Sequence, residues 1–189
     1  MRAYGWFLGC SICVGLSGAV LAQPSVSFAD LQGAVIHTRV LFQQEGLSNG
    51  QPFQNQAEAV STITIDSTNT LTNTVVSTAY NPRGIRTSPP RTGSFTLGQP
   101  REVSSAGGGN AMWSFQDGKL INIRSFKAGA YRGTISFSRG AEGLRCTLHA
   151  AYAREAGIAD WNWISPISGT DIRMKSIRPI SSDCQAAKR

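Results

Sequence analysis

Apolar and polar residues alternate over short stretches along most of the chain, which is the pattern of half-buried β-strands. In Ala34–Phe42, for example, Ile36, Val40 and Phe42 share one face while His37 and Arg39 fall on the other. The same pattern predicts strands over Ala57–Ile65, Leu71–Ala79, Ser94–Leu97, Ala111–Gln116, Lys119–Phe126, Tyr131–Ser138 and Leu144–Tyr152, and one that begins at Ile172.

Turn residues separate these stretches. Asp117-Gly118 is a strong two-residue hairpin signal, and Asp66–Thr70 has the polar residues of another turn. The segments Asn81–Gly93 and Gln99–Asn110 are rich in Pro or Gly and are predicted as loops. No periodicity of a helix follows the first 22 residues. We therefore predict an all-β fold, a single antiparallel barrel or sandwich of about eight or nine strands.

The first 22 residues have the features of a cleaved secretory signal peptide. Arg2 supplies a positive charge, Ala3–Ala22 contains none, and Val20-Leu21-Ala22 offers small residues at the cleavage positions. We therefore divide the chain into a signal peptide, 1–22, and one β domain, 23–189, in the periplasm or outside the cell. An uncleaved anchor is the alternative, and no later segment is long and apolar enough to cross a membrane.

Export changes the interpretation of the four cysteines. Cys10 and Cys13 match a redox pattern but lie in the apolar part of the predicted signal peptide, so the mature chain keeps Cys146 and Cys184. In an oxidising compartment these two are expected to form a disulfide that ties the C-terminal segment to the rest of the domain. A pair of catalytic or metal-binding thiols is the alternative, although neither cysteine has a second ligand at metal-binding spacing.

The net charge of +7 is concentrated in the second half of the chain, and fourteen of the eighteen basic residues are Arg, which binds phosphate and carboxylate well. A basic surface of this kind suits an anionic envelope polymer such as lipopolysaccharide. No nucleic-acid motif accompanies the charge, so nucleic acid is the least favoured polyanion. The candidate anion-binding residues are Arg124, Arg132, Arg145, Arg173 and Lys175.

Two tryptophans form the most unusual local feature. Trp161 and Trp163 are two positions apart, so in a strand their indoles would share a face. They could stack on a sugar or cover the mouth of a pocket, and the alternative is that they pack in the core. Trp113, which lies between Met112 and Phe115, is predicted to be a core residue.

Catalytic patterns are weak. His37 and His149 are the two histidines, and no H-x-H or H-x-x-x-H spacing makes either a metal ligand. Carboxylates are scarce and none are paired as in a glycosidase. The sequence therefore predicts no cofactor, no metal and no catalytic residue. A secreted hydrolase with a site near His37 or His149 remains the alternative to a non-enzymatic protein.

Several short motifs resemble those of a group of small exported bacterial proteins that carry no assigned activity. The motifs are Gly93–Gly98, Gly107–Gly109, Trp113–Gly118 and Arg145-Cys146. More loosely, Leu31-Gln32-Gly33 and the hairpins are similar to lipocalin-like barrels, although Ala34-Val35 stands where a lipocalin has its Gly-x-Trp tryptophan. The resemblance implies a β-barrel and transfers no functional residue.

These observations favour an exported, non-enzymatic binding or interaction module of the cell envelope. Within that class two possibilities compete: a barrel that holds a small apolar or sugar ligand, and a basic surface that binds a polyanion. A filled interior would favour the surface, and a cavity would favour the barrel.

Overall fold

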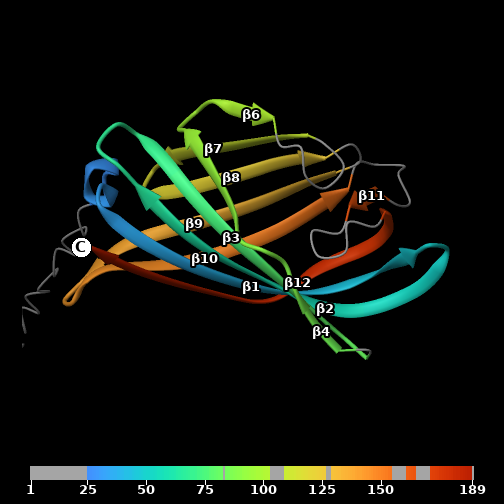
Figure 1. Cartoon of the computed structure of the whole chain (residues 1–189). Coiled ribbons are helices and arrows are strands. Elements are labelled where there is room, and N and C mark those ends of the chain that lie inside the picture. The colour runs from blue at the N-terminus through green and yellow to red at the C-terminus, as the bar shows by residue number, and fades with distance from the viewer. Residues whose placement is uncertain are drawn as a thin grey trace, which may run out of the picture.

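The computed structural model describes residues 25–82, 84–102, 109–126, 129–154, 161–164 and 171–188. These residues form twelve strands and one short 3-10 helix, and all the strands pair antiparallel in two sheets (Figure 1). The predicted all-β antiparallel fold is therefore confirmed, as a sandwich or open barrel. The predicted signal peptide, 1–22, lies outside the described residues. Within the described part of the chain, no helix is long and apolar enough to cross a membrane.

Most strands pair with the strand that follows them in the chain, and the last strand, β12, pairs with the first, β1. Sheet A has seven strands in the order β11-β12-β1-β2-β3-β4, with β5 also paired to β3, and sheet B has five in the order β10-β9-β8-β7-β6. Sheet A contains β1 (Ala34–Ser48), β2 (Gln51–Ile65), β3 (Thr70–Asn81), β4 (Gly84–Thr87), β5 (Arg91–Thr96), β11 (Trp161–Ile164) and β12 (Asp171–Lys188). Sheet B contains β6 (Pro100–Glu102), β7 (Asn110–Gln116), β8 (Lys119–Phe126), β9 (Gly129–Gly140) and β10 (Gly143–Arg154).

Some strands run further than the alternation predicts. β1 and β2 continue through Gln43–Gln56 and form a long hairpin arm (Figure 1), turned at Asn49-Gly50, where both residues have positive φ, 51° and 75°. Most of the arm's residues are polar or partly exposed, so they lack the apolar alternation that reveals a half-buried strand. β4 and β6 likewise lie within segments predicted as loops. All their residues are exposed, so these strands have no buried face that alternation could reveal.

The inner faces of the two sheets form the core. One cluster joins Ile36, Ile63 and Leu71 of sheet A to Leu120 and Ile135 of sheet B. A second cluster, further along the sandwich, contains Val40, Phe42, Ala150, Met174 and Ile177. Most of these residues occupy every second position of their strands, as the predicted alternation requires, and a register shift between β1 and β12 separates Met174 from Ile177 by three positions.

The 3-10 helix Phe28–Leu31 packs against the first cluster at one end of the sandwich (Figure 1). Leu31 is fully buried, and the ring of Phe28 meets that of Phe115 edge to face with centroids 5.5 Å apart. Asp30 accepts hydrogen bonds from the backbone and the hydroxyl of Ser27, both at 2.8 Å, and pairs with Arg139 of β9 at 2.6 Å. A single side chain therefore links the N-terminal segment to sheet B.

The two sheets are joined at one edge by side chains. Cys146 of β10 and Cys184 of β12 form a disulfide, with Cα atoms 5.6 Å apart, which confirms the predicted pairing. Beside it, the Ser182 hydroxyl donates a hydrogen bond of 2.6 Å to the Leu148 carbonyl oxygen. We call this contact between β10 and β12 the β10–β12 seam.

We expect the disulfide to contribute strongly to stability. It closes a loop of 38 residues, for which the chain-entropy estimate is about 4 kcal/mol. The double variant Cys146→Ala/Cys184→Ala should lose up to this amount from the free energy of unfolding in a urea titration. Wild type unfolded under reducing conditions should match the variant, and a loss below about 1 kcal/mol would contradict the estimate.

The Asp30 contacts predict a defined pH dependence. The hydrogen bonds from Ser27, with the Arg139 pair, lower the pKa of Asp30 from 3.8 to about 2. A carboxylate whose pKa is depressed by folding stabilises the protein above its unfolded pKa, and that contribution is lost as pH falls toward the folded pKa. Asp30→Asn should therefore lower the melting temperature at pH 7, and the difference from wild type should shrink between about pH 4 and pH 2. A pH-independent difference would show that the charge is not responsible.

Candidate functional site

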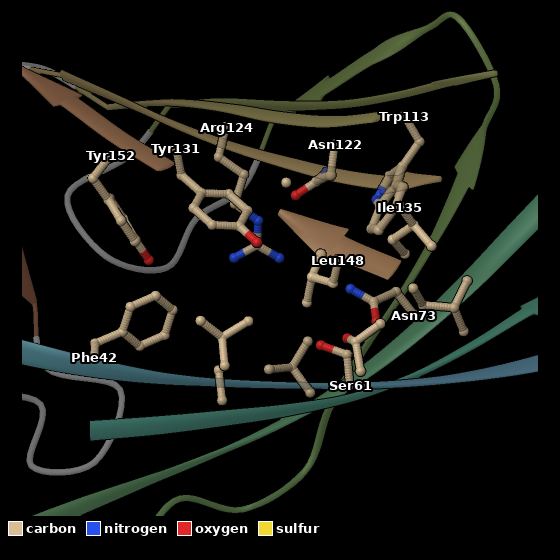
Figure 2. A pocket seen from close by; sticks show the side chains of 16 residues that line it. Phe42, Ser61, Asn73, Trp113, Asn122, Arg124, Tyr131, Ile135, Leu148 and Tyr152 are labelled. Atoms are coloured by element: carbon tan, nitrogen blue, oxygen red, sulfur yellow. The ribbon is translucent and has the colours of Figure 1, made fainter. Parts of the chain in front are cut away.

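A cavity of about 90 Å³ lies between the sheets, where the two core clusters meet (Figure 2). Pockets that hold drug-sized ligands have volumes of roughly 300–1,000 Å³. This cavity is smaller and therefore suits a compact ligand. Most of the lining side chains are apolar or aromatic. The lining residues are Thr38, Val40, Phe42, Ala59, Ser61, Ile63, Asn73, Val75, Trp113, Asn122, Arg124, Tyr131, Gly133, Ile135, Leu148 and Tyr152.

Strand alternation places the polar members of this lining. On β8, Asn122 and Arg124 follow the fully buried Leu120 at every second position, so all three share the inner face. The register pairs Arg124 with Tyr131 of β9 and Asn122 with Gly133. Sequence reasoning placed Arg124 on an anion-binding surface, and the structure places it in the wall of the cavity instead.

One part of the cavity is aromatic and cationic. Tyr131 and Tyr152 lie with ring centroids 4.9 Å apart, Phe42 meets Tyr152 edge to face at 5.4 Å, and Arg124 extends beside Tyr131 (Figure 2). Burial raises the pKa of both phenols, against the opposing effect of the nearby Arg124 charge. The two hydroxyls therefore stay protonated at neutral pH, and a protonated phenol can donate a hydrogen bond.

No carboxylate balances the Arg124 charge in the structure as described. The ion pairs among the described residues are Arg39–Glu58 and Asp30–Arg139. Arg124 belongs to neither, and it is the one charged residue in the cavity lining. A guanidinium that is partly removed from water and lacks a counterion is costly, so the cavity wall is electrostatically suited to an anion.

A second polar part of the lining contains two buried atoms without a hydrogen-bond partner, the indole nitrogen Nε1 of Trp113 and the amide oxygen Oδ1 of Asn73. Trp113 is 4% exposed, as its predicted core position requires. Figure 2 shows both residues on the side of the cavity opposite Phe42 and Tyr152. Buried polar groups are nearly always paired, so these atoms point to a ligand or water between the sheets.

Gly133 makes room for one wall of the cavity. A Cβ atom built at this residue would lie 2.6 Å from the Tyr131 hydroxyl oxygen, because the Tyr131 ring lies back over its own strand. Gly133 has no positive φ, so its requirement is the close approach of the ring and not the backbone conformation. The absence of a side chain at Gly133 therefore allows the Tyr131 ring to occupy this position.

The structure does not gather the other predicted basic residues into one patch. Arg132 and Arg145 are exposed on β9 and β10 of sheet B, whereas Arg173 and Lys175 are exposed on β12 of sheet A. The outward orientation predicted for Arg132 agrees with its exposure. With Arg124 inside, the five residues occupy three separate places.

The two histidines also lie apart. His37 is exposed on β1 with its Nδ1 3.2 Å from the Thr62 hydroxyl, and His149 is exposed on β10 beside Thr134. The one buried carboxylate among the described residues, Glu58, pairs with Arg39 and accepts a hydrogen bond of 3.0 Å from the Tyr80 hydroxyl. No group of three potential metal ligands occurs in the described ranges.

Trp161 and Trp163 lie in β11, which pairs with β12 at the outer edge of sheet A. The two residues are two positions apart in this strand. Their side chains lie outside the described part of the structure, so the sugar-stacking hypothesis stays a prediction.

Comparisons of the chain with protein-family models, with curated proteins and with solved structures found no match in any of the three.

The Gly133 geometry predicts a local effect. Gly133→Ala should push the Tyr131 ring into the cavity and change stability by less than about 1 kcal/mol, since the flexible ring yields and Ala lowers the entropy of the unfolded chain. Ring NMR signals of Tyr131 and the neighbouring Tyr152 should shift. Gly140→Ala is the matched control, because the three atoms nearest its Cβ all belong to the side chain of the exposed Arg145. Unchanged tyrosine signals in Gly133→Ala would contradict the geometry.

Proposed function

We propose that the mature protein is an exported, non-enzymatic binding protein that holds a compact ligand in the cavity between its sheets. The observation that carries this proposal is the pair of unpartnered buried atoms, Trp113 Nε1 and Asn73 Oδ1, in a cavity with mostly apolar walls. Ligand sites commonly combine apolar walls with a few polar groups that orient the ligand.

The disulfide supports the exported location, since such bonds persist in oxidising compartments. The scattering of Arg132, Arg145, Arg173 and Lys175 over two sheets favours the cavity over a polyanion surface as the binding site. The outward histidines, with no carboxylate bonded to either in the contacts of the described chain, favour binding over hydrolysis.

A variant that fills the cavity tests this function. Ala59 lines the cavity, whereas Ala151 is exposed on β10, so Ala59→Leu and Ala151→Leu add the same atoms inside and outside. Native mass spectrometry of protein purified from the periplasm should show extra mass on wild type and on Ala151→Leu that disappears on denaturation. Ala59→Leu should carry none. Wild type without bound mass, or Ala59→Leu with its full share, would contradict the proposal.

A further inference from the structure

Arg124 narrows the chemistry of the ligand. Its side chain belongs to the cavity wall, it lies in register with Tyr131 on β9, and no carboxylate pairs with it among the residues described. All other lining residues are neutral, so the cavity wall has a net positive charge. An anionic ligand would supply the charge that the fold omits.

The remaining walls decide which kind of anion fits. Part of the lining is formed by Val40, Phe42, Ile63, Ile135 and Leu148, whose side chains are apolar and offer no hydrogen bonds. An organic acid can bury its apolar body against these walls, whereas an inorganic ion has no apolar surface to bury there. The small volume limits that body to about a ring or a short branched chain.

We propose that the cavity ligand is a compact organic monocarboxylate, held by the Arg124 guanidinium with its apolar body between the sheets. The planar guanidinium presents two parallel N–H groups that match the two carboxylate oxygens. The protonated hydroxyl of Tyr131, beside Arg124, adds a hydrogen-bond donor on the same side of the cavity. This inference rests on the proposed function, because it names the ligand class of the same site.

Benzoate and its neutral counterpart benzamide make a matched pair of probes, since they differ mainly in charge. Isothermal titration of wild type should show benzoate binding about ten- to hundredfold more tightly, as expected for a hydrogen-bonded charge pair. Arg124→Met should abolish that preference, because the variant has no guanidinium to pair with the carboxylate. Arg124→Lys should keep part of the preference for benzoate, because lysine retains the positive charge but lacks the two parallel N–H groups of the guanidinium.

Arg132→Met is the control for net charge. Arg132 stands on the neighbouring strand β9 but is exposed, so its loss removes the same charge outside the cavity and should leave the preference for benzoate intact. Circular dichroism and the melting temperature show whether each variant is folded. If Arg124→Met does not fold, Arg124→Lys and the wild-type comparison of the two probes still test the inference.

The outcomes separate the two proposals. Equal binding of benzamide and benzoate, or a preference that survives in Arg124→Met, overturns the carboxylate inference and leaves ligand binding standing. Release of a neutral compound from wild-type protein on denaturation would likewise overturn the carboxylate inference and leave ligand binding standing. If neither probe binds and nothing co-purifies, both the inference and the proposed function are overturned.

Discussion

The β10–β12 seam is the constraint on which the rest of the structure depends. The two sheets meet there through the Cys146–Cys184 disulfide and the hydrogen bond from Ser182 to the Leu148 carbonyl. These contacts adjoin the cavity: Leu148 lines it, and β1 pairs Thr38 with Cys184 and Val40 with Ser182. Leu148 therefore belongs to both the seam and the cavity wall, and the β1 partners of Cys184 and Ser182 line the cavity as well. Any change in the seam acts on both stability and the space between the sheets.

The polar groups inside the sandwich are hard to explain by stability alone. An unpartnered buried indole N–H or amide oxygen costs about 1–3 kcal/mol, and apolar residues at Trp113 and Asn73 would avoid that cost. Arg124 adds a charge with no counterion in the same lining. Departures from a well-packed apolar core are expected where function requires them, and here three of them surround one cavity.

The sequence predicts the parts of the fold that depend on local pattern. Alternation identified the inner face of β1 at Ile36 and Val40, and Asp117-Gly118 forms the expected hairpin between β7 and β8, with φ of 49° and 70°. The polar hairpin arm, Gln43–Gln56, is not predicted from the sequence. Its strands are held by backbone pairing between β1 and β2 and bury little apolar surface, so they leave no alternation to detect.

The candidate site was missed for a related reason. On β8, Leu120 marks one face as apolar, but Ile121 and Ile123 make the other face apolar too, so the orientation of Arg124 is ambiguous in the sequence. Only the register with β9, which places Arg124 beside Tyr131, resolves it. The signal that could have indicated the site is the set of polar or small residues at inner positions of three strands: Asn73, Asn122, Arg124 and Gly133.

Interior and surface charge act together on an anionic ligand, but over different distances. The exposed arginines of β9, β10 and β12 and the net charge of +7 raise the concentration of anions around the whole protein. That long-range attraction is screened within about 10 Å at moderate salt. Arg124 acts at contact and is partly shielded from solvent between the sheets, so screening weakens it less. For the ligand proposed above, the surface charge would govern how often the anion arrives, whereas the cavity would govern which anion stays. The basic composition that first suggested a polyanion surface is thus equally consistent with capture of a single small acid.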